Sequence, residues 1–94
     1  MQANYMTKVI DILTDAKLDK KSALTKVRQL IVDSKIRDFS ALYTFLYAEI
    51  DNYAQGHIGN VILILAEGDV NDTFATDKEL HIVDTLLKII GEIK

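Results

Sequence analysis

The C-terminal segment, LHIVDTLLKIIGEIK at residues 80–94, constrains the fold most because it is apolar on two sides at helical spacing. A surface helix of a monomeric domain needs only one apolar stripe. A helix with two stripes is buried on two sides, either in the middle of one domain or between a domain and a partner. One stripe consists of Leu80, Val83, Leu87 and Ile90, and the other consists of Ile82, Leu86, Ile89 and Ile93.

The composition indicates one small helical domain. The chain has 94 residues, of which 49% are hydrophobic, and it contains no proline. It therefore has enough apolar surface to form a core and no obligate helix breaker. We predict an all-α fold, a compact bundle of about five helices, in a single domain over residues 1–94. The helices are expected near residues 5–16, 20–34, 38–55, 57–67 and 78–94.

Short polar side chains and glycines mark the expected helix ends. N-caps are predicted at Asp19, at Asp38, and at either Thr76 or Asp77. Gly56 is expected to end the third helix and Gly68 the fourth, so residues 68–76 are predicted to be the main loop.

The run VILILA at residues 61–66 has the composition of either a buried strand or a buried helix. We favour a helix because the chain has no second strand-like run to pair with it, and a lone strand would leave backbone groups unsatisfied. Because the run is apolar on all sides, we expect this helix at the centre of the domain.

The sequence contains no recognisable catalytic or nucleotide-binding arrangement. The glycine-rich patterns that hold phosphates are missing, no cysteine is available, and Ser40 has no identifiable histidine and acid partners. The formal charge of −3 disfavours direct nucleic-acid binding, although the aromatic residues between 39 and 53 leave a base-stacking platform open. We therefore predict no catalytic residue, no cofactor and no enzymatic activity.

Metal binding is not expected either. Asp69, Asn71 and Thr73 have the spacing of the first EF-hand ligands, but Phe74 replaces the required glycine and Leu80 replaces the final glutamate. His81 has only Asp84 on its own helical face, which is too few ligands for a metal site.

Residues 38–94 resemble the C-terminal collar domain of clamp-loader small subunits of the replication-factor-C type, particularly those of T4-like bacteriophages. The matching features are the opening Asp38-Phe39-Ser40, the amphipathic LYTFLYAEID, an apolar helix ending at residues 66–68, and Glu79-Leu80-His81 at the start of an apolar C-terminal helix. The upstream segments VIDILTD and SALTKVRQLIVDS resemble the paired helices that begin such a domain. The proline often seen before the fourth helix is replaced here by His57-Ile58.

This resemblance implies a non-catalytic oligomerisation domain that holds AAA+ ATPase subunits in a ring during DNA replication. The implied partners are other clamp-loader subunits or further copies of the chain, while the sliding clamp and DNA would be reached only through ATPase modules that these residues lack. We predict Ile82, Leu86, Ile89 and Ile93 as the subunit interface, with the roles of the two stripes open to exchange. The alternative is a stand-alone helical adaptor or regulator that binds a partner through its C-terminal helix.

The location expected for the chain is the cytoplasm, of the host cell if the protein is viral. The N-terminal residues lack the uninterrupted apolar core of a signal peptide, and the longest apolar run, at residues 61–66, is too short to span a bilayer.

Overall fold

A computed structural model describes residues 3–94, with side chains from residue 5 onward, and shows an all-helical domain. No strand is present among these residues. None of their helices is long and apolar enough to cross a membrane. The helices are α1 (Ala3–Thr14), α2 (Lys20–Ser34), α3 (Ser40–Ala48), α4 (Ile50–Tyr53), α5 (Ile58–Asp72) and α6 (Lys78–Ile93).

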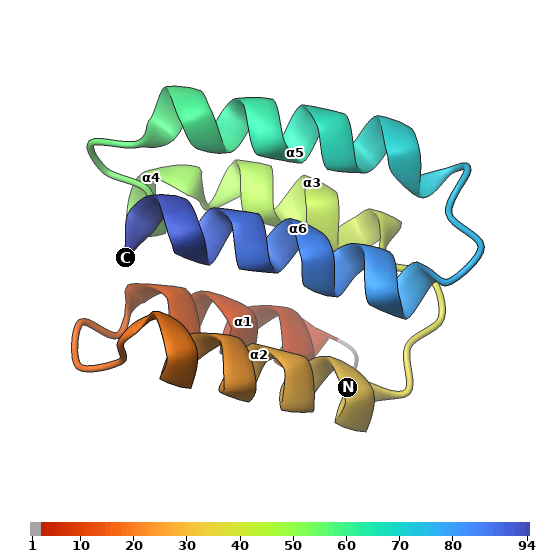
Figure 1. Ribbon diagram of the computed structural model, residues 1–94, viewed down its shortest axis with the longest axis horizontal. Coiled ribbons are helices and arrows are strands. Elements are labelled where there is room, and N and C mark those ends of the chain that lie inside the picture. The colour runs from red at the N-terminus through yellow and green to blue at the C-terminus, as the bar shows by residue number, and fades with distance from the viewer. Residues whose placement is uncertain (1–2) are drawn as a thin grey trace.

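The C-terminal helix α6 occupies the middle of the bundle (Figure 1). It packs against α2 on one side and α5 on the other, while α1 pairs with α2 and α3 packs against α5. The short helix α4 contacts α1, α3 and α5. The whole measures 31 × 26 × 22 Å. Of the two explanations for an α6 that is apolar on two sides, this packing supports the first, a position in the middle of one domain.

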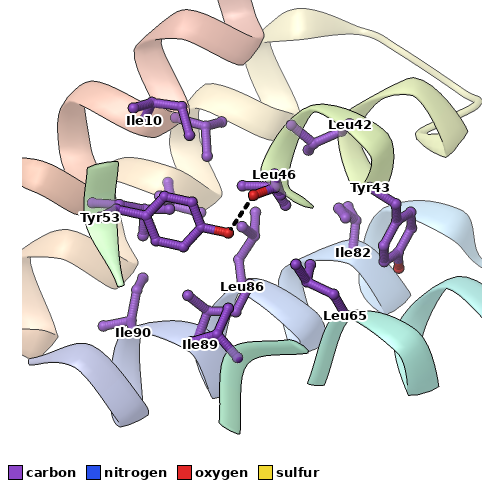
Figure 2. Close-up of a cluster of buried hydrophobic side chains, with 14 of the residues drawn as sticks. Ile10, Leu42, Tyr43, Leu46, Tyr53, Leu65, Ile82, Leu86, Ile89 and Ile90 are labelled. Carbon is purple, nitrogen blue, oxygen red and sulfur yellow. Dashed lines mark hydrogen bonds between the residues drawn. The ribbon is translucent and has the colours of Figure 1, made fainter. Parts of the chain in front are cut away.

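The core forms around the inward side of α6, as Figure 2 shows. Ile82, Leu86, Ile89 and Ile90 of α6 are buried there. They meet buried side chains from every other helix. Burial of these large side chains provides the main stabilisation of the fold, at about 1.5–3 kcal/mol for each side chain.

The expected third helix is divided in two at Glu49, which differs from the single helix predicted over residues 38–55. Glu49 has φ −97° and ψ 11°, outside the usual helical range. The hydroxyl of Tyr53 donates a buried hydrogen bond of 2.7 Å to the carbonyl oxygen of Leu46 (Figure 2). In an uninterrupted helix that carbonyl would accept from the amide of Ile50. This tertiary hydrogen bond accompanies the break and has no signature in the sequence.

The prediction that Gly68 ends the next helix is wrong, because α5 continues to Asp72. Gly68 is buried inside α5, where a Cβ atom would lie 2.8 Å from Oγ1 of Thr85 and 2.9 Å from Cε1 of Tyr43. The glycine is therefore needed for close packing against α6 and α3, not for a left-handed turn. Gly56, in contrast, has φ +84° and lies in the turn between α4 and α5.

The run at residues 61–66 is helical, as predicted, but it does not lie at the centre of the domain. Val61 and Leu65 are buried, whereas Ile62 and Leu63 are exposed. Helix α5 contacts α6, α3 and α4 through one side only, so its opposite side faces solvent. Its apolar outer residues are therefore surface residues.

The predicted N-terminal caps are largely confirmed. The Asp19 carboxylate accepts from the amide of Ser22 at 2.8 Å, and the Asp77 carboxylate accepts from the amide of Leu80 at 3.0 Å. Asp38 lies one residue before the N-cap of α3, yet its carboxylate accepts from the amide of Ser40 at 3.0 Å. Each acid supplies an acceptor to an otherwise unpaired amide at a helix start.

Candidate interaction surface

The predicted subunit interface lies mostly inside the domain. Ile82, Leu86 and Ile89 have 0% of their surface exposed, and Ile93 is partly buried. A side chain without accessible surface cannot contact a second chain unless the fold opens. The assignment of this stripe to a neighbour therefore does not fit the structure, because α2 and α5 already cover it. The outward residues of the other stripe are Leu80 and Leu87.

Large hydrophobic side chains are nevertheless exposed in one part of the chain. Phe74, in the turn after α5, is 81% exposed, and Leu63 and Leu80 are both more than two-thirds exposed. Six of the eight such residues belong to α5, α6 or the turn between them. The full set is Val32, Tyr47, Ile62, Leu63, Val70, Phe74, Leu80 and Leu87. Where exposed hydrophobic side chains form a contiguous patch, they are typical of a protein interaction site.

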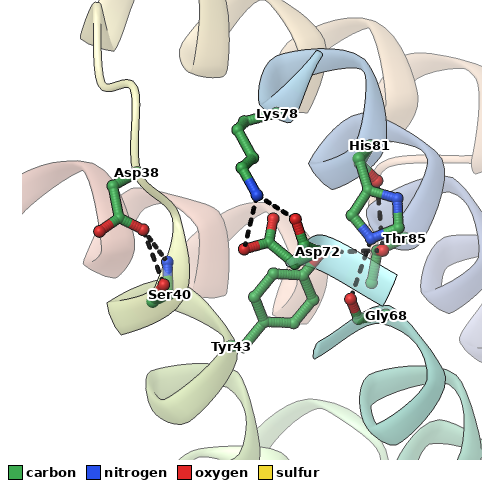
Figure 3. A network of polar contacts seen from close by, with 8 residues as sticks. All are labelled: Asp38, Ser40, Tyr43, Gly68, Asp72, Lys78, His81 and Thr85. Carbon is green, nitrogen blue, oxygen red and sulfur yellow. Dashed lines mark hydrogen bonds and ion pairs between the residues drawn. The ribbon is translucent and has the colours of Figure 1, made fainter. Parts of the chain in front are cut away.

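A polar cluster joins the end of α5 to the start of α6 (Figure 3). The ammonium group of Lys78 donates to the carbonyl oxygen of Asp72 and lies 3.7 Å from its Oδ2 atom. Asp72 is buried, and its other carboxylate oxygen, Oδ1, has no hydrogen-bond partner among the described residues. The lysine thus pairs with a buried charge that would otherwise be costly.

His81 is part of the same cluster. Its Nε2 atom donates a 2.9 Å hydrogen bond to the carbonyl oxygen of Gly68, so α6 is fastened to the middle of α5. The hydroxyl of Thr85 donates to the His81 carbonyl oxygen at 3.2 Å and lies 3.2 Å from the Tyr43 hydroxyl. Burial raises the pKa of Tyr43 above its ordinary value. The hydrogen bonds of His81, Thr85 and Tyr43 are made within the domain, so these side chains have a structural role.

The predicted loop over residues 68–76 begins later than expected, after Asp72. Asp69 and Asn71 belong to α5, and Thr73 is its C-terminal cap. Over residues 3–94, no group of three His, Cys, Asp or Glu side chains is arranged to hold a metal ion. The Ser40 hydroxyl donates to the Asp38 carboxylate at 2.7 Å. This hydrogen bond and the one from the backbone amide of Ser40 both lower the pKa of Asp38 at the start of α3.

A second group of polar contacts, which the sequence did not reveal, links α5 and its preceding turn to the end of α6. The Glu92 carboxylate lies 2.9 Å from Nδ1 of His57 and accepts from the Asn60 amide at 3.1 Å. Both contacts lower the pKa of Glu92, that of Asn60 most. Farther along, Lys88 lies between Asp84 at 3.2 Å and Glu67 at 3.6 Å. The Asp84–Lys88 pair lies within α6 at i,i+4 spacing, whereas the contacts of Glu92 and the Glu67–Lys88 pair join residues more than 20 positions apart, so no local pattern could reveal them.

A shallow groove of about 270 Å³ runs between α3 and α5. Its floor is formed by the buried residues Tyr43 and Leu65, and Tyr47, Ile62 and Ala66 are exposed along it. Asp69 supplies a negative charge to its lining.

Comparisons of the chain with protein-family models, curated proteins and solved structures gave no match.

Proposed function

We propose that the chain is a non-catalytic helical interaction module and that it serves as the collar of a DNA-polymerase clamp-loader subunit. The exposed apolar surface of α5, the following turn and α6 carries this proposal. A surface of this kind is expected where a module is covered by its neighbours in an assembly. The resemblance of residues 38–94 to replication-factor-C collars supports the same assignment, although the apolar helix of that segment ends at Asp72 and not at residues 66–68.

In this role, the neighbouring subunits cover Val70, Phe74 and Leu80, and not the buried stripe of α6. These three residues lie at the end of α5, in the turn, and in the first turn of α6. The polar cluster of Asp72, Lys78 and His81 fixes the two helices to each other. A rigid support of this kind reduces the entropic cost of association, because little ordering is needed when a partner binds.

Light scattering with increasing protein concentration tests this function. We expect the wild-type mass to rise above that of a monomer and Val70→Asp and Phe74→Asp to remain monomeric, because a charge opposes burial of the surface. Asn71→Asp is a matched control, since it adds the same charge beside Val70 and removes no apolar side chain. A wild-type chain that stays monomeric up to millimolar concentration would contradict the proposal and favour the stand-alone adaptor.

Calorimetric titration with Mg-ATP provides a second test. A collar without a phosphate loop should give no heat of binding and no hydrolysis. Anisotropy with primed DNA should give weak binding at physiological salt, because a chain of formal charge −3 gains little from counterion release. Micromolar affinity for Mg-ATP, or nanomolar affinity for DNA, would exclude the collar role.

A further inference from the structure

The charges of the chain are distributed very unevenly along the fold. All eleven Lys and Arg residues lie before residue 38 or after residue 77, so the segment that forms α3, α4 and α5 contains none. Residues 38–77, which include these helices, carry seven acids. They are Asp38, Glu49, Asp51, Glu67, Asp69, Asp72 and Asp77. Lys78 of α6 pairs with Asp72 and Lys88 with Glu67, and the other five acids form no ion pair among the described residues. The α3–α5 side of the molecule is therefore still net negative, and the α1–α2 hairpin lies on the opposite side (Figure 1).

The groove between α3 and α5 lies within this negative region. Asp69 is part of its lining, and negative charges at Asp72, Asp69 and Asp84 contribute, after burial, to the raised pKa of Tyr43 on its floor. The rest of the lining is mostly apolar, with Tyr47 and Ile62 exposed along it, although Thr44 adds a hydroxyl group. It thus combines a mostly apolar lining, the exposed aromatic side chain of Tyr47 and the carboxylate of Asp69, which forms no ion pair among the described residues.

We propose that the α3–α5 groove binds an amphipathic helix of a partner protein, with apolar residues facing the groove and Lys or Arg beside Asp69. This inference goes beyond the proposed function, because it concerns another kind of partner at the α3–α5 groove, whereas the neighbouring subunits are proposed to cover Val70, Phe74 and Leu80. Helix-in-groove recognition requires an apolar channel between two helices, and flanking acids select a basic helix by charge complementarity.

Two features favour a helix over other occupants. The groove volume of about 270 Å³ is smaller than the pockets of about 300–1,000 Å³ that enclose small molecules, so it suits a few side chains of a larger partner. The negative surroundings repel phosphate groups, which disfavours nucleic acids and anionic lipid surfaces.

A second copy of the chain fits the groove less well. Its basic hairpin, α1–α2, exposes only one large hydrophobic side chain among the described residues, Val32. That surface would bring positive charge to the groove but few apolar groups to fill it. Two copies that met groove to groove would place acids against acids. A separate basic amphipathic helix supplies both components.

Fluorescence anisotropy with two synthetic peptides tests the inference. Both are amphipathic helices of equal length, one built from Leu and Lys and the other from Leu and Glu. At about 0.15 M salt, we expect the Leu–Lys peptide to bind the full chain at least about tenfold more tightly than the Leu–Glu peptide. Equal binding of the two peptides, or no binding of the basic one, would overturn the inference.

Matched variants locate the binding site. Asp69→Lys and Ala66→Arg should each weaken binding of the Leu–Lys peptide by about tenfold or more, because they place positive charge in the groove. Glu67→Lys makes the same charge change as Asp69→Lys on the same helix, but outside the groove lining. It should weaken binding by less than about threefold. Equal losses in Asp69→Lys and Glu67→Lys would mean that overall charge, and not the groove, attracts the peptide.

Light scattering of the same variants separates this inference from the proposed function. Circular dichroism first confirms that each variant is folded, and Ala66→Arg should then keep the self-association of the wild type. Loss of self-association in that variant would place a second copy in the groove and overturn the inference. A chain that fails to self-associate but binds the basic peptide would contradict the proposed function alone.

Discussion

Gly68 of α5 lies so close to Thr85 of α6 that a Cβ atom on residue 68 would be 2.8 Å from the Thr85 Oγ1 atom. Tyr43 closes the other side of the same space, with its Cε1 atom 2.9 Å from that position. The three helices α3, α5 and α6 therefore meet at a point where the chain has no room for a methyl group.

We expect Gly68→Ala to lower the free energy of unfolding by about 1–2 kcal/mol. Overpacking costs about 1–3 kcal/mol, and the better helix propensity of alanine offsets up to about 1 kcal/mol of this. Gly59→Ala is the matched control in the same helix, because nothing lies within 4 Å of its added Cβ. It should leave stability unchanged or raise it. Urea denaturation of both variants measures the difference, and equal stability would show that α5 and α6 separate easily.

Leu80 and Leu86, one residue from each apolar stripe of α6, should respond in opposite ways to a charge. Leu86 is fully buried and Leu80 is 68% exposed. Leu86→Asp should cost about 4 kcal/mol or more, because an unpaired carboxylate is buried, and this is enough to unfold a small domain. Leu80→Asp should change stability by no more than about 0.5 kcal/mol. Circular dichroism with thermal melting decides this, and a folded Leu86→Asp variant would show that the core assignment of α6 is wrong.

The helical class and several helix starts could be predicted because their causes are local. Asp19 and Asp77 each supply an acceptor to an amide three residues later, so the cap appears in the sequence itself. The spacing of apolar residues likewise reveals the period of each helix. These features need no knowledge of the tertiary structure.

The predictions that are wrong concern positions where contacts between residues far apart in the sequence decide the structure. Gly68 resembles a helix end in the sequence, but Thr85 and Tyr43 require a glycine there inside a continuing helix. The two stripes of α6 are similarly apolar, and only the packing of the other helices decides that Ile90 of one stripe is buried with Ile82, Leu86 and Ile89 of the other. The exposed surface of α5 was missed for the same reason, since a run that is apolar on all sides does not show which side is covered.

The hydrogen bond from Tyr53 to Leu46 should stabilise the break between α3 and α4. Burial raises the pKa of Tyr53 far above its ordinary value, which keeps the hydroxyl protonated and able to donate. Tyr53→Phe should lower the free energy of unfolding by about 1 kcal/mol, because a buried carbonyl loses a donor. Tyr47→Phe is the control at an exposed tyrosine and should have an effect within about 0.5 kcal/mol. Equal effects in urea denaturation would argue against this hydrogen bond.

Low pH should weaken the N-terminal cap that Asp19 provides to α2. The amide and hydroxyl of Ser22 lower the pKa of Asp19, the amide most, so the folded state favours the carboxylate. The resulting stability is present above the unfolded pKa of about 4 and is lost as the pH falls through the lower pKa of the folded state. Asparagine caps helices about as well as aspartate but does not titrate in this range. The difference in unfolding free energy between pH 7 and pH 3 should therefore be smaller in Asp19→Asn than in the wild type. Urea denaturation at the two pH values measures this difference, and an unchanged pH dependence would show that the cap does not couple folding to this proton.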